Sequence, residues 1–135
     1  MKEKRRFAPA SETGIRARPT ILVVEDEVLV RIAAAEYLRA AGYTVMEAAD
    51  ADEAIRLMTA APSIDLVFSD VHMPGAMDGY GLRAWILRER PRVKVLLTSG
   101  SMHAGGGNGS GGRHLIVKPY AFGELDRWIR ELLGL

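Results

Sequence analysis

Three acidic side chains end two apolar stretches of the chain. Asp70 follows the mostly apolar run 66–69, and Glu25 and Asp26 follow the apolar run 21–24. Apolar runs of this length, bounded by turn residues, predict buried parallel strands, whose carboxyl ends meet at one edge of a sheet. Three carboxylates within ~4–6 Å would repel one another by a few kcal/mol per pair, so they favour a bound cation. Because all the donors are oxygens, Mg²⁺ is the predicted cation.

A hydroxyl and an ammonium group end two further apolar runs. Thr98 follows residues 95–97 and Lys118 follows residues 115–117, so both are expected at the same edge as Asp70. There Asp70 would act as a nucleophile toward a phosphoryl group and form an aspartyl phosphate. Lys118 and the cation would offset charge on the phosphoryl oxygens, and the Thr98 hydroxyl would donate to one of them. The strand ends therefore carry groups that suit binding of a divalent cation and a phosphoryl group.

Strand-like and helix-like segments alternate along the chain and would position these side chains. The three-to-four spacing of Leu29, Ile32, Ala33 and residues 36–38 predicts one helix. An acidic variant of the capping box, Asp50 and Glu53, begins the next. Such alternation predicts an α/β fold with a doubly wound, five-stranded parallel sheet. The expected strands cover 20–24, 43–48, 65–69, 93–98 and 114–117, and the expected helices cover 28–41, 51–60, 80–90 and 122–133.

The composition excludes several classes of protein. The chain has 135 residues, which suits one domain with a single core, and 48% of them are hydrophobic. No run approaches the roughly 18 apolar residues of a transmembrane helix, so no membrane span is expected. The absence of cysteine excludes disulfides, thiolate metal sites and cysteine nucleophiles. We expect a cytoplasmic protein.

The first residues have a charge pattern of their own. Residues 1–18 hold six lysines and arginines against two glutamates, whereas the whole chain has a net charge of +1. They show no apolar period and lack the apolar core of a secretory signal. We expect a disordered basic tail over 1–18 and a folded domain over 19–135. Contact of the tail with nucleic acid or membrane lipid is the alternative.

The order of these motifs resembles one protein family. The acid pair, the Asp-x-x-Met-Pro sequence 70–74, Thr98 and the Lys118-Pro119 pair occur in the order and at the spacing of receiver domains from two-component response regulators. The resemblance extends over residues 20–133. It implies a flavodoxin-like sheet with strand order 2-1-3-4-5 and a peptide bond before Pro119 that is commonly cis in this family.

The resemblance also implies a role for each site residue. Asp70 would be the phospho-acceptor, with Thr98 and Lys118 beside it, and a histidine kinase or a phosphotransfer protein would be the phosphodonor. The output would be a phosphorylation-controlled contact with an unidentified downstream protein. The implied Mg²⁺ ligands are Glu25, Asp26, Asp70 and the backbone carbonyl of His72.

The chain departs from that family in three places. Residues 105–112 contain six glycines, each of which costs roughly 0.8–1 kcal/mol relative to alanine within a helix. The helix that the family places between the fourth and fifth strands is therefore expected to be shortened or absent, with a mobile loop over 101–112. Leu115 stands where many members carry an aromatic switch residue. The turn from Asp70 to Gly79 is one residue longer than in the commonest members.

We interpret the chain as a stand-alone receiver without a DNA-binding or enzymatic output module, because it ends two residues after the last expected helix. Its catalysis would be limited to self-phosphorylation and dephosphorylation at Asp70. One alternative is an aspartyl-phosphate phosphohydrolase of the haloacid dehalogenase type, but that family needs an acid two residues after the nucleophile, where His72 stands. The other is a degenerate receiver that binds partners without being phosphorylated, against which the complete set of acids, threonine and lysine argues.

Overall fold

The computed structural model describes residues 18–61, 63–100 and 114–135. Within these ranges, strands and helices alternate along most of the chain. The strands are β1 (Thr20–Val24), β2 (Thr44–Ala48), β3 (Leu66–Asp70), β4 (Lys94–Ser99) and β5 (Leu115–Val117), and the helices are α1 (Val28–Ala40), α2 (Ala51–Ala60), α3 (Gly79–Glu89) and α4 (Phe122–Leu133). These are the predicted elements, and no end differs from its predicted position by more than about one residue.

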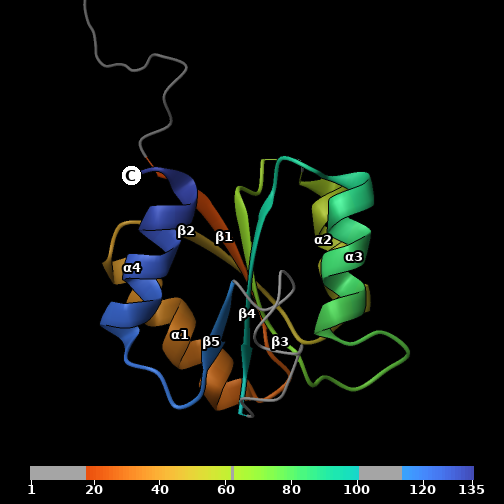
Figure 1. Ribbon diagram of the computed structural model, residues 1–135, viewed down its shortest axis with the longest axis horizontal. Helices are drawn as coiled ribbons and strands as arrows, with labels where there is room; N and C mark the ends of the chain where they lie inside the picture. Colours follow the sequence, from red (N-terminus) through yellow and green to blue (C-terminus); the bar gives the residue numbers. More distant parts are fainter. Residues whose placement is uncertain (1–17, 62, 101–113) are drawn as a thin grey trace, which may run out of the picture.

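The five strands form one parallel sheet in the order β2-β1-β3-β4-β5. Helices α1 and α4 cover one face of the sheet, and α2 and α3 cover the other (Figure 1). The predicted doubly wound architecture and its strand order are therefore confirmed. The strands run toward the lower edge of the view in Figure 1, so the residues that follow them gather at that edge.

Each face of the sheet packs into its own apolar core. Ile21 and Val23 of β1 face the core under α1 and α4, whereas Leu22 and Val24 face the core under α2 and α3. Because helices cover both faces, all residues of β1 and β3 are buried. This burial is why the two strands appear in the sequence as nearly continuous apolar runs.

The apolar spacing from which α1 was predicted marks only part of the buried face of that helix. Leu29 is 81% exposed and Ile32 is 40% exposed, whereas the buried residues of α1 are Ala34, Ala35 and Leu38. Small alanine side chains let the helix approach the sheet closely. Leu29 and Ile32 remain on the outer surface, and Leu29 lies at the start of the helix, close to the carboxyl end of β1.

Strand β3 is shifted by one residue from its predicted range of 65–69. The ladder with β4 continues through Asp70, which is paired with Thr98. At the other end, the Asp65 carboxylate accepts a hydrogen bond from the Thr20 amide at 2.8 Å, outside the strand. Asp70 is thus the last residue of the strand, and pairing with β4 holds its backbone in place.

The predicted N-cap of α2 at Asp50 is confirmed, but the return bond of Glu53 goes to the amide of Ala49, one residue before the N-cap. Oδ1 of Asp50 accepts from the amide of Glu53 at 2.8 Å, and the Glu53 carboxylate accepts from the amide of Ala49 at 2.8 Å. Two regions named in the sequence analysis, the tail before residue 18 and the segment 101–112 with its glycine-rich run, lie outside the described residues. No helix in the described ranges is long and apolar enough to cross a bilayer.

Candidate functional site

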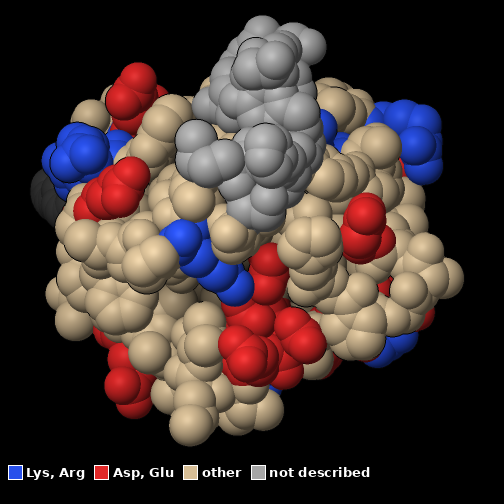
Figure 2. All heavy atoms as spheres, turned by 60° about the horizontal axis from the view of Figure 1, so that its bottom comes forward, with Lys and Arg blue, Asp and Glu red and all other residues tan. Residues whose placement is uncertain are grey.

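Three carboxylates meet at the carboxyl edge of the sheet. Val24 of β1 pairs with Ser69 of β3, so the residues that follow these two positions lie side by side. Oxygen atoms of Glu25, Asp26 and Asp70 all lie within 4.8 Å of one another. Figure 2 looks onto this edge and shows acidic side chains gathered there with a basic side chain next to them. The predicted acidic cluster is thus present in the fold.

The three acids differ in their exposure to solvent. Glu25 and Asp70 are buried, at 5% and 7% exposure, whereas Asp26 is exposed. Burial raises the pKa of Glu25, and the charge of Asp70 adds to this effect; the Glu27 amide and Lys118 act in the opposite direction. The exposed Asp26 leaves one side of the cluster open to solvent. A small cation can therefore enter from that side.

Lys118 provides the positive charge of the site. Its Nζ atom lies 2.9 Å from Oδ2 of Asp70 and 3.4 Å from Oε1 of Glu25. Burial lowers the pKa of Lys118, but the hydrogen bond to Asp70 and the charges of both acids outweigh it and raise the pKa on balance. The lysine reaches this place because it directly follows β5. Its peptide bond to Pro119 is cis.

The hydroxyl of Thr98 is buried without a hydrogen-bond partner among the described residues. Thr98 is 2% exposed, and its Oγ1 atom forms no hydrogen bond with any residue in the described ranges. A buried hydroxyl without a partner costs about 1–3 kcal/mol. Because Thr98 pairs with Asp70 across the ladder, an acceptor group carried by Asp70 would lie on the same edge of the sheet.

Comparison with known proteins agrees with this arrangement. The family model described as the response regulator receiver domain matches residues 21–130. The chain belongs to this family. Its members are receivers of two-component signalling systems and not enzymes of a classical kind, which argues against the haloacid dehalogenase alternative.

The relatives of this receiver domain include a sensor kinase and a response regulator. It is 33% identical over 125 residues to the sensor kinase CckA of Brucella abortus, covering 90% of this chain and 13% of that protein. Among solved structures, the receiver domain of the hybrid histidine kinase CckA is 38% identical, with a TM-score of 0.70. The match covers 84% of this chain and 98% of that structure's chain. The response regulator TrrA of Thermotoga maritima, solved in complex with Mg²⁺-BeF, is 29% identical, with a TM-score of 0.76. The match covers 85% of this chain and 99% of the TrrA chain. The chain spans 45% and 47% of two further curated relatives.

The peptide backbone around Asp70 is held from several sides in this receiver domain. The amide of His72 donates to Oδ1 of Asp70 at 3.2 Å, while the His72 side chain is exposed. A Cβ atom on Gly79 would collide with the carbonyl oxygen of Asp70 and lie 2.7 Å from Cα of Val71. Sequence reasoning treated Gly79 only as a turn residue. Its requirement comes from this close approach, which no local pattern reveals.

Sequence reasoning also missed Arg31. Its Nη1 atom donates to the backbone carbonyl of Glu25 at 2.8 Å, and its Nε atom lies 3.3 Å from Glu47 of β2. Arg31 stands six positions after Glu25, in α1, where the sequence suggests only a solvated arginine. The contact with Glu47 depends on the neighbouring strand β2, so the local sequence around Arg31 carried no signal for it.

Aromatic side chains lie near the site although position 115 is not aromatic. Leu115 is half-buried and packs against the core under α2 and α3. Tyr120, two residues after Lys118, packs edge-on against Phe68 with ring centroids 5.7 Å apart. Burial raises the pKa of Tyr120 to about 12.

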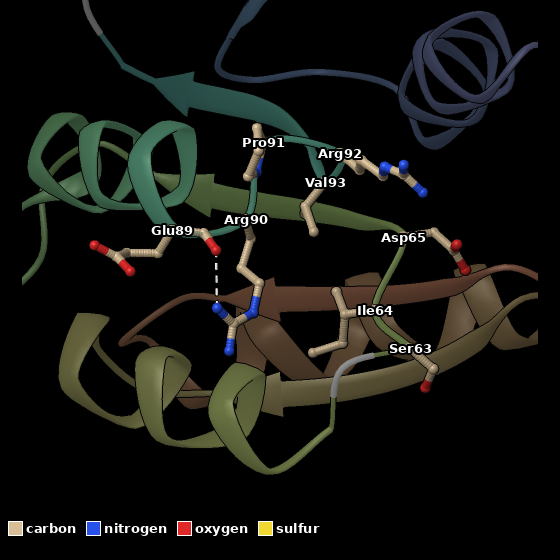
Figure 3. Close-up of a pocket in the computed structure, with 8 residues that line it drawn as sticks. All are labelled: Ser63, Ile64, Asp65, Glu89, Arg90, Pro91, Arg92 and Val93. Carbon is tan, nitrogen blue, oxygen red and sulfur yellow. Dashed lines mark hydrogen bonds between the residues drawn. The ribbon is translucent and has the colours of Figure 1, made fainter.

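Two of the hollows lined by the described residues lie at different places on the molecule. One lies beside the site, is lined by Leu29, Val30, Lys118 and Phe122, among others, and is largely apolar. The other lies at the opposite edge of the sheet, next to Asp65, and is shown in Figure 3. There, the side chains of the two lining arginines, at positions 90 and 92, point in different directions, so they do not converge on a single ligand.

Proposed function

We propose that this receiver domain accepts a phosphoryl group on Asp70 from a histidine kinase or a phosphotransfer protein. The observation that carries the proposal is the position of Lys118, whose Nζ atom lies 2.9 Å from Oδ2 of Asp70 within a cluster of three carboxylates. A lysine and an acidic cluster around one aspartate suit phosphoryl transfer, in which catalysis is mainly positioning and charge stabilisation.

The donor set of the site fits Mg²⁺. Glu25, Asp26 and Asp70 offer only oxygen ligands within 4.8 Å of one another, and the exposed side of Asp26 leaves space for the waters that Mg²⁺ keeps. We propose these three residues and the backbone carbonyl of His72 as its ligands. When bound, the ion would neutralise charge that develops on the phosphoryl oxygens.

In the transfer step, a carboxylate oxygen of Asp70 forms a bond to phosphorus. The bond between phosphorus and the imidazole nitrogen of the donor breaks, and that nitrogen keeps the electron pair. Lys118 offsets negative charge on the transferred group. The Thr98 hydroxyl, which lacks a partner among the described residues, donates to a phosphoryl oxygen.

The surface beside Asp70 supports docking of a protein donor. Val28 and Leu29 are 54% and 81% exposed at the start of α1, next to the acidic pair. The largely apolar hollow between α1 and Lys118 continues this surface. A partner that carries a phosphohistidine would cover these apolar side chains while it presents the phosphoryl group to Asp70. The output would be a protein contact that depends on phosphorylation.

Intact-mass measurement after incubation with Mg²⁺ and a small acyl phosphate tests the proposal. We expect one phosphoryl adduct in the wild type and none in Asp70→Asn. Asp78→Asn is the matched control, because Asp78 is exposed and caps α3 by accepting from Gly81, a role that asparagine retains. An adduct in Asp70→Asn at the wild-type level would overturn the assignment. A wild type that never forms an adduct would favour the degenerate receiver.

A further inference from the structure

Arg31 contacts the peptide that joins the two proposed metal ligands. The carbonyl of Glu25 belongs to the peptide bond between Glu25 and Asp26, and it accepts a hydrogen bond from Nη1 of Arg31 at 2.8 Å. The Arg31 side chain is only 17% exposed. The contact therefore holds the orientation of the peptide plane that joins the two Cα atoms carrying the acidic side chains.

The other restraints on this turn come from either side of that carbonyl. The amide of Glu25 donates to the carbonyl of Ala48 at 3.0 Å, and the amide of Glu27 donates to Oε2 of Glu25 at 3.1 Å. Asp26 is exposed, so its position depends on the backbone that carries it. Arg31 supplies the contact that fixes the backbone between these two amides.

Glu47 keeps the Arg31 side chain in place. Oε1 of Glu47 lies 3.3 Å from Nε of Arg31, and its Oε2 lies 3.2 Å from Nη2 of Arg39. The two arginines thus share one carboxylate on β2. They differ in their second contact, because Arg39 donates to the carbonyl of Val45 and Arg31 donates to the carbonyl of Glu25.

We infer that Arg31 is a positioning residue that holds the turn of Glu25 and Asp26 in the geometry that binds Mg²⁺. The inference rests on the proposed function, since it takes these acids as ligands of the ion. The direction of the effect separates positioning from simple electrostatics. A guanidinium charge repels a cation, so loss of the charge alone would tighten Mg²⁺ binding, whereas loss of positioning would weaken it.

Mg²⁺ titrations of Arg31→Met and Arg39→Met test the inference. Both variants lose one positive charge and one ion pair with Glu47, but only the first loses the contact to Glu25. We expect the Kd for Mg²⁺, followed by amide chemical shifts, to rise about 10-fold in Arg31→Met, as for other groups that orient metal ligands. It should change by about 2-fold or less in Arg39→Met, because a distant exposed charge is screened by solvent. Arg31→Lys should recover part of the affinity, because an ammonium group can still donate to the carbonyl.

A second measurement needs no metal. Amide hydrogen exchange of Glu27 in Mg²⁺-free protein should become faster in Arg31→Met and stay unchanged in Arg39→Met, because the Glu27 amide bonds to the Glu25 side chain. Equal or tighter Mg²⁺ binding in Arg31→Met, together with unchanged exchange, would overturn the inference and leave the proposed function standing. A wild type that binds no Mg²⁺ would count against the proposed function instead, and the exchange measurement would still decide whether Arg31 holds the turn.

Discussion

Nζ of Lys118 lies 2.9 Å from Oδ2 of Asp70, which connects the end of β5 to the end of β3 across the intervening strand β4. The pKa of Lys118 is raised on balance, so the lysine is charged at neutral pH. We expect Lys118→Met to slow phosphorylation by a small acyl phosphate about 100-fold, the scale for removal of a group that stabilises developing charge. The rate is measured by intact mass over time.

Lys94→Met is the control for this experiment. Lys94 is exposed at the start of β4, at the opposite edge of the sheet, and its loss should leave the rate unchanged. A Lys118→Met protein that is phosphorylated at the wild-type rate would show that the lysine has no part in the transfer.

Mg²⁺ should stabilise the fold through Asp26. At a concentration about ten times the Kd, a bound ion raises the free energy of unfolding by about 1.4 kcal/mol. Asp26→Ala should lose this increase, whereas Glu27→Ala, which removes an exposed acid from the same turn, should keep most of it. Thermal unfolding with and without Mg²⁺ provides the comparison. The same Mg²⁺ response in both variants would contradict the proposed ligand set.

Gly79 should tolerate no side chain. Gly79→Ala brings a Cβ atom into collision with the carbonyl of Asp70, and overpacking of this kind costs about 1–3 kcal/mol. We expect urea denaturation to show this loss and phosphorylation to slow, because the displaced backbone carries Asp70. Gly123→Ala is the matched control. It lies in α4, where its added Cβ would meet no atom within 4 Å other than its chain neighbours and the backbone of its own helix, and alanine is favoured over glycine within a helix. Equal stability of the two variants would contradict the close approach.

Ionisation of Tyr43 should lower the stability of the fold at alkaline pH. Burial, then the hydrogen bond to Asp126 at 2.6 Å, raises the pKa of Tyr43 above its ordinary value of 10.0. A raised pKa in the folded state means that the stabilisation is complete below about pH 10 and is lost as the pH rises further. Tyr43→Phe should therefore lower the free energy of unfolding by about 1–2 kcal/mol at neutral pH. The difference in free energy of unfolding between this variant and wild type should become smaller in more alkaline solution.

Urea denaturation at neutral and alkaline pH measures this difference. Tyr80→Phe serves as the control at neutral pH, because the Tyr80 hydroxyl is buried without a partner among the described residues and its removal should cost little. A gap between Tyr43→Phe and wild type that stays constant from about pH 7 to about pH 11, across the ordinary pKa of tyrosine, would count against the role of the hydrogen bond.

Much of the site could be predicted from the sequence because its determinants are local. The apolar runs before Asp70, Thr98 and Lys118 mark buried strands, and the geometry of a parallel sheet places all three residues at one edge. The same local signals located the N-cap of α2 at Asp50. The apolar spacing in α1 predicted the helix correctly but only part of its buried face, because the small side chain of Ala34 packs against the sheet while Leu29 is exposed.

The tertiary structure alone decided which distant groups touch. Arg31 reaches Glu47 only because β2 lies beside β1, and Gly79 must lack a side chain only because the chain returns against the backbone of Asp70. These contacts depend on how separate elements pack, so neither spacing nor composition records them. Local chemistry thus indicated which residues are candidates for phosphoryl transfer, and packing determined which residues hold them in place.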